Sequence, residues 1–144
     1  MRKLRPVGPG ALYGCLAALA LAGPGLAQTG NIELELNTAQ AVDGGCRLTY
    51  VATNATPVSL EKPSYEVAVY DAEGIVRRLL VLEFGWLPSG KTRVVQFDLP
   101  QQDCAQISRI SVNGPVECTS AEGEQTLCRD RQLLSSRVPS IQFN

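Results

Sequence analysis

The chain contains no histidine among its 144 residues, and this absence removes several kinds of chemistry. Neither a Ser-His-Asp nor a Cys-His catalytic arrangement can form without an imidazole base. No two cysteines have the Cys-x-x-Cys spacing of a zinc site, and no glycine-rich phosphate loop is present. We therefore expect a protein that is not an enzyme and that holds no metal and no cofactor.

Long apolar runs are also scarce, because the chain has only one, over residues 11–22. Three basic residues precede it: Arg2, Lys3 and Arg5. Small residues follow it, and this order predicts a secretory signal peptide over residues 1–27, cut after Ala27. An uncleaved anchor is the alternative, but the run is shorter than the about 20 apolar residues that span a membrane. We expect a periplasmic or secreted protein with no stable membrane insertion once the signal is removed.

Positive charge is sparse in the remaining chain, residues 28–144. The leader holds three of the 13 basic residues and none of the 14 acidic ones, which leaves 10 basic and 14 acidic residues and a net charge of −4. Contact with a nucleic-acid backbone requires a basic surface. The charge balance therefore argues against a nucleic-acid partner, and the length suits a single domain.

Alternation of apolar and polar residues is the dominant pattern that is present. Five segments carry it, residues 32–36, 46–53, 65–69, 93–99 and 107–112, and a sixth candidate strand, residues 75–84, is a nearly continuous apolar run. Turn residues such as Asp71-Ala72-Glu73-Gly74 separate them, and residues 138–143 are the candidate for a seventh strand. We therefore predict an all-β fold, an immunoglobulin-like two-sheet antiparallel sandwich of six or seven strands. Residues 125–136 have partial helical spacing and are expected to form one or two helical turns.

Four of the 5 cysteines lie in residues 28–144, and an even number in a small exported chain predicts disulfides. If successive strands alternate in direction, Cys46 and Cys104 lie at one end of the domain and Cys118 at the other. We therefore predict the pairs Cys46–Cys104 and Cys118–Cys128, with the second closing a short loop in the tail after residue 113. A redox-active pair is the alternative, because arginine follows both Cys46 and Cys128, and nearby positive charge lowers a thiol pKa.

The segment Val67-Ala68-Val69-Tyr70-Asp71 resembles the name-giving motif of FxLYD-type domains, in which an aromatic residue, any residue, Leu, Tyr and Asp follow one another. Tyr70 and Asp71 match this motif, whereas Val67 replaces the aromatic residue and Val69 the leucine. Two further segments are similar to the family's hairpin and its Pro-Gly turn: residues 74–76 and 87–91. The resemblance implies a small immunoglobulin-like sandwich outside the cytoplasm, and it implies no catalytic residue.

The fourth expected strand, residues 75–84, carries apolar residues on both faces. One face of a strand in a small sandwich normally lies in water, so Leu79 and Val81 would form an apolar patch there. We interpret this patch as a surface for a protein partner that adds a strand at an exposed edge. The alternative is that the C-terminal segment, residues 138–143, covers it.

Trp86 lies at the end of the same segment and is the third residue of the candidate patch. An exposed tryptophan beside a proline turn can stack on a sugar or a peptide, whereas a lone tryptophan in a small β-domain is more often part of the core. The function we predict is a non-catalytic exported binding or accessory module that presents an edge strand and loops to a protein partner. The alternatives are a carbohydrate-binding or enzyme-inhibitor module that uses Trp86, and a thiol-redox protein.

Overall fold

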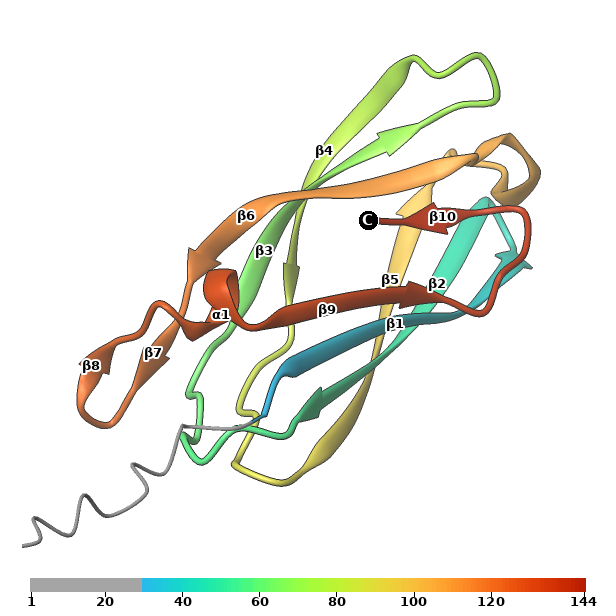
Figure 1. Cartoon of the computed structure of the whole chain (residues 1–144). Coiled ribbons are helices and arrows are strands. Elements are labelled where there is room, and N and C mark those ends of the chain that lie inside the picture. The colour runs from blue at the N-terminus through green and yellow to red at the C-terminus, as the bar shows by residue number, and fades with distance from the viewer. Residues whose placement is uncertain (1–29) are drawn as a thin grey trace, which may run out of the picture.

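Two four-stranded β-sheets packed face to face form the protein in the computed structural model, which describes residues 30–144 (Figure 1). The strand order is β5-β2-β1-β9 in the first sheet and β10-β6-β3-β4 in the second. The strands are β1 (Ile32–Val42), β2 (Gly45–Asn54), β3 (Ser64–Tyr70), β4 (Val76–Glu83), β5 (Thr92–Pro100), β6 (Arg109–Glu117), β7 (Thr119–Ser120), β8 (Gly123–Glu124), β9 (Gln132–Ser136) and β10 (Gln142–Phe143). The prediction of an all-β sandwich is confirmed, while the expected signal peptide lies outside the described residues.

The core follows directly from the period of two in the sequence. In β2, every second side chain is buried, because successive side chains of a strand point to opposite faces of the sheet. Tyr50 of β2 reaches across to the second sheet, where its ring centroid lies 6.1 Å from that of Phe84 and 5.3 Å from that of Phe143. Burying one such large apolar side chain contributes roughly 1.5–3 kcal/mol, so these contacts between the sheets hold the two layers together.

Both predicted disulfides are present. Cys46 in β2 is joined to Cys104 in the 3-10 turn η1 (Cys104–Gln106), with Cα atoms 5.0 Å apart. Cys118, which follows β6, is joined to Cys128 in the single-turn helix α1 (Leu127–Asp130), with Cα atoms 6.0 Å apart. The second bond closes the short loop that holds β7 and β8. Figure 1 shows this loop at the end of β6.

The C-terminal part departs from the expectation in two places. Residues 125–136 contain one helical turn, α1, as predicted, but the chain then enters an unpredicted strand, β9, which runs parallel to β1 from Ile32↔Gln132 to Leu36↔Ser136. The seventh strand is shorter than expected, because only Gln142 and Phe143 pair, as β10, parallel to β6. The pairs β1–β2, β2–β5, β3–β4 and β3–β6 are antiparallel as predicted, so the parallel pairs are confined to the side of the sandwich that β9 and β10 form.

The sixth strand also differs from the prediction, which ended it at residue 112. In the structure β6 continues to Glu117, with register shifts against β3 on either side of Tyr65↔Pro115. These irregularities accommodate a proline, which has no N–H to donate to the ladder. Within residues 30–144, no helix is long and apolar enough to cross a membrane.

Candidate functional site

The strand β4 lies at one edge of its sheet. Among the described residues it pairs with β3 alone, from Ser64↔Glu83 to Tyr70↔Val76. Figure 1 shows β3 and β4 as a long hairpin whose turn projects from the upper end of the molecule. Within residues 30–144, one long side of β4 therefore has no neighbouring strand.

The hydrogen-bonding phase of β4 decides which backbone groups face this free side. The N–H of Phe84 donates to the carbonyl of Pro63, with 3.0 Å between N and O. Residues of an antiparallel pair alternate between positions bonded to the partner strand and positions that point away from it. Leu82 and Leu80 therefore face β3. Three residues direct their N–H and C=O groups toward the free edge: Leu79, Val81 and Glu83.

The side chains of these three residues lie on the outer face of the sheet. Leu79 is 63% exposed and Val81 is 48% exposed, whereas the neighbouring Leu82 is buried in the core. The C-terminal segment does not cover them, because β10 lies beside β6, at the opposite edge of the same sheet from β4. The alternative that this segment covers the patch is therefore wrong. Exposed β4 residues that also have free backbone groups form the surface that we call the β4 edge: Leu79, Val81 and Glu83.

Trp86 lies beyond the end of β4, in the connection to β5. It is 63% exposed, so Trp86 is not a core residue. Its backbone carbonyl accepts a hydrogen bond from the Arg93 guanidinium, with 3.4 Å between the N and O atoms. The structure thus brings Leu79 and Val81 together on one face and leaves Trp86 separate from them, on the loop that follows.

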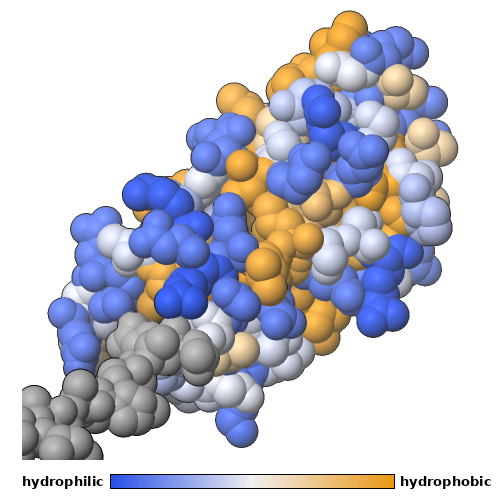
Figure 2. Space-filling view, in the orientation of Figure 1, coloured by the Kyte–Doolittle hydropathy of each residue, from blue (hydrophilic) through white to orange (hydrophobic). Residues whose placement is uncertain are grey.

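Two further exposed apolar residues at the other end of β4 escaped the sequence analysis. Ile75 is 52% exposed and Val76 is 46% exposed. Strict alternation places Val76 on the same face as Leu80 and Leu82, but the pairing shifts register where Val69 and Tyr70 meet β4. Figure 2 shows apolar side chains beside polar ones at the upper end of the molecule, where the β3–β4 hairpin lies in Figure 1. The signal for this shift was the bulge-forming turn at residues 71–74.

The hairpin turn is fixed by Asp71, whose side chain is nearly fully buried. Its carboxylate accepts hydrogen bonds from the N–H groups of Glu73 and Ile75, at 3.0 and 2.9 Å, and from the guanidinium of Arg77. The N–H of Ile75, assisted by Arg77, holds the pKa of Asp71 below its usual range. Asp71 is therefore a turn residue that also anchors Arg77 at the start of β4.

The strand β5 is one edge of the other sheet and provides a comparison. Its outward side chains are mostly polar, and Asp98 forms a two-bond ion pair with Arg47 of β2, at 2.6 and 2.7 Å. Val94 is the exposed apolar residue there, at 62%. The guanidinium of Arg78 donates to the carbonyl of Pro100, which links β4 to β5 across the side of the sandwich. The β5 edge therefore offers a less apolar surface than the β4 edge does.

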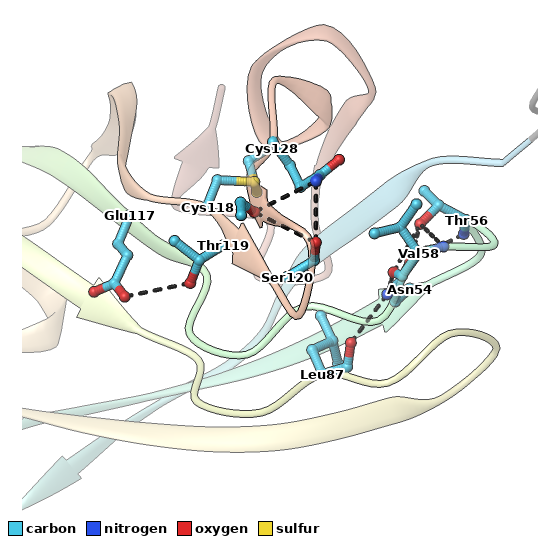
Figure 3. Close-up of a disulfide and its surroundings, with 11 residues drawn as sticks. Asn54, Thr56, Val58, Leu87, Glu117, Cys118, Thr119, Ser120 and Cys128 are labelled. Carbon is cyan, nitrogen blue, oxygen red and sulfur yellow. Dashed lines mark hydrogen bonds between the residues drawn. A yellow bond between two sulfur atoms is a disulfide. The ribbon is translucent and has the colours of Figure 1, made fainter.

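The second disulfide is buried where β6 ends. Cys118 and Cys128 are 5% and 0% exposed. Figure 3 shows Ser120 beside the Cys118–Cys128 disulfide, within the loop that the disulfide closes. The hydroxyl of Ser120 accepts hydrogen bonds from the N–H of Glu122 and the side-chain amide of Gln125, at 3.1 and 3.0 Å. Thiol exchange requires access to a sulfur atom, so this burial favours a structural role over a redox-active one.

The two buried tyrosine hydroxyls of the core are poor candidates for acid–base catalysis. The hydroxyls of Tyr50 and Tyr65 are buried and have no hydrogen-bond partner among the described residues. Burial raises the pKa of both tyrosines above the usual value, so neither can exchange a proton near neutral pH. The described residues also contain no group of three or more metal-ligating side chains.

The hollows of the surface are small or shallow. One beside α1 has a volume of about 120 Å³ and is lined by residues that include Thr56, Leu127 and Asp130. Another, of about 400 Å³, is an open depression at the β1–β2 hairpin. Pockets for small ligands usually enclose about 300–1,000 Å³. The first hollow is too small and the second too open for a typical small-ligand pocket, so the β4 edge is the better candidate site.

Comparison of the chain with family models, with curated proteins and with solved structures finds no match. The resemblance to FxLYD-type domains thus stays a prediction.

Proposed function

We propose that this protein is a non-catalytic binding module of the periplasm or the cell exterior that binds an extended segment of a protein partner at the β4 edge. The observation that carries the proposal is the combination of free backbone groups and exposed apolar side chains at Leu79 and Val81. Export is supported by the leader pattern and by the two disulfides, because such bonds persist outside the reducing cytosol.

Strand addition would use both properties of the β4 edge. Main-chain hydrogen bonds to Leu79, Val81 and Glu83 would align the partner segment, at about 0.5–1.5 kcal/mol net for each bond. Contacts with the two apolar side chains would add the selectivity that backbone bonds lack. Six such bonds at three positions supply roughly 3–9 kcal/mol, and association itself costs an estimated 4–15 kcal/mol. The backbone bonds therefore leave little surplus, and the apolar contacts decide the affinity.

The immunoglobulin-like assignment is part of this proposal. The order β1-β2-β5 in one sheet and β6-β3-β4 in the other is compatible with it. Two pairs depart from an antiparallel sandwich, because β9 runs parallel to β1 and β10 runs parallel to β6. Both pairs lie on the side opposite to β4. The proposed binding surface is thus on the regular part of the fold.

Site-specific photo-crosslinking tests the proposal. A benzoylphenylalanine residue is placed at position 79 in cells that make the protein, and a second variant carries it at position 94 on the β5 edge. Because Leu79 and Val94 are 63% and 62% exposed, they form a matched pair. We expect a protein crosslink from position 79 and none from position 94. Absence of any crosslink from position 79 would refute the proposal.

The exposure of Trp86 favours a second candidate function, a carbohydrate-binding module. Its indole would stack on a sugar ring at the loop between β4 and β5. Binding on a glycan array that is lost in the Trp86→Ala variant would support this function. Equal binding by both proteins, or none by either, would exclude it.

A further inference from the structure

The outward residues of β4 form a pattern that is complementary to itself. Beyond the register shift at the start of the strand, where Val76 is also exposed, every second residue points outward: Arg77, Leu79, Val81 and Glu83. A positive residue thus lies at one end, a negative residue at the other, and two apolar residues lie between them.

We propose that the partner that fits the β4 edge is β4 of a second copy of this chain, which pairs with it in antiparallel orientation. In this register Leu79 lies opposite Val81 of the second copy, and Arg77 lies opposite Glu83. Leu80 lies opposite Leu80 of the second copy, and the two-fold axis passes between them. The inference rests on the proposed function, because it names the occupant of the same edge.

The backbone phase of β4 is compatible with this register. Leu79 and Val81 both direct N–H and C=O toward the free edge, so each can exchange two hydrogen bonds with its counterpart in the second copy. The pairing would join two four-stranded sheets into one continuous sheet. Both outer faces would lie on the same side, which places the four apolar side chains next to one another.

Neighbouring registers fit less well. A shift that places Leu79 opposite Leu79 puts Arg77 opposite Val81 and Glu83 opposite Ile75. The opposite shift places Val81 opposite Val81 and leaves Glu83 opposite Leu79. Only the register centred on Leu80 matches charge with charge and apolar residue with apolar residue, and opposite charges across a strand pair favour their register.

The charged residues at the two ends are available for this contact. The Arg77 side chain is 56% exposed although its Nε contacts Asp71. Glu83 is exposed and forms no ion pair within the described residues. In the β5 edge, by contrast, no basic residue shares the outward positions with Asp98, whose carboxylate is already bonded to Arg47. Charge complementarity thus selects the β4 edge.

Sedimentation of the purified mature protein at low salt tests the inference. We expect a dimer whose dissociation constant rises about tenfold in Glu83→Arg and in Arg77→Glu, because each reversal creates two symmetry-related pairs of like charge. An equimolar mixture of these two variants should dimerise again, because both arginines of one variant then face glutamates of the other. A monomeric wild-type protein, or a mixture that fails to recover, would overturn the inference.

A backbone variant keeps the test decisive if a charge reversal disturbs the hairpin. Val81→Pro removes an N–H that points to the free edge, so it leaves the β3–β4 ladder intact but blocks the second copy. Gln96→Pro on β5 is the matched control, because its N–H also points away from the neighbouring strand. We expect dissociation of the dimer with Val81→Pro only, and equal dissociation with both variants would contradict the inference.

The crosslinking experiment separates this inference from the proposed function. A crosslink from position 79 to the same chain supports both. A crosslink to a different protein, together with a monomeric purified chain, would overturn the second-copy inference and leave the proposed function standing. No crosslink to any protein would overturn the proposed function.

Discussion

The strongest single test of how the fold is held together is the substitution Asn54→Ala. Asn54 ends β2 and is 0% exposed. Its side-chain amide donates to the carbonyls of Val58 and Leu87, at 2.8 and 3.0 Å. Its side-chain oxygen accepts from the N–H and the hydroxyl of Thr56, at 3.0 and 2.7 Å. Figure 3 shows these groups converging on one side chain from the segment after β2 and from the loop before β5.

The expected magnitude follows from the number of bonds. Alanine removes all four contacts at a buried site, and a net value of about 1 kcal/mol for each gives a loss of about 4 kcal/mol in the free energy of unfolding. Folded proteins have only about 5–15 kcal/mol in total, so the variant should be severely destabilised. Asn113→Ala is the matched control, because Asn113 is exposed and donates one bond, to Glu66. We expect it to change stability by less than about 0.5 kcal/mol.

Urea unfolding followed by circular dichroism provides the assay, with the midpoint and the slope fitted for each variant. A shift in midpoint at constant slope is the expected result for Asn54→Ala. If Asn54→Ala costs no more than Asn113→Ala, the network does not hold the two segments, and the reasoning from buried hydrogen bonds fails at this site.

Three further predictions concern the disulfide loop, the hairpin turn and the β4 edge. Serine at both Cys118 and Cys128 should lower the free energy of unfolding by roughly 3 kcal/mol, from the entropy of the 10-residue separation, and an unchanged urea midpoint would contradict this. The lowered pKa of Asp71 stabilises the fold above the unfolded pKa of about 4, and this contribution is lost as the pH falls through the lower folded pKa. The stability difference between wild type and Asp71→Asn should therefore shrink on acidification in pH-dependent melting, and a constant difference would refute it. Threonine at both Leu79 and Val81 should leave the melting temperature within a few degrees of wild type, because both side chains are exposed. The same double variant should no longer form a dimer in sedimentation. A large drop in its melting temperature would indicate that the two residues have a role in folding instead.

The regular part of the fold could be predicted from the sequence because its signals are local. Alternation in β2 buries Cys46, Leu48 and Tyr50, and one buried face per strand leaves little choice of orientation. The disulfide pairing followed from counting strand directions, since Cys46 and Cys104 lie at the same end. The exposure of Leu79 and Val81 followed from the same alternation.

The irregular parts depend on contacts between segments, which local patterns indicate only in part. Leu133 and Leu134 fit a helix as well as a strand, and the choice is made by β1, whose edge accepts β9 with Ile32↔Gln132. Val76 points outward because of a register shift in the β3–β4 hairpin, which depends on both strands. The Asn54 network was likewise hidden, because its partners lie up to 33 residues away.

The pairing of β1 with β9 has a consequence for how the molecule matures. Ile32 and Gln132 are partners although 100 positions separate their numbers, and the N–H of Ile32 donates to the carbonyl of Arg131 at 2.9 Å. Until Gln132 and the residues after it are available, the outer flank of β1 has no β9 to pair with. Pairing between such distant segments forms slowly, since the intervening loop must close first. The first sheet therefore reaches its four-stranded form only when nearly the whole chain is present.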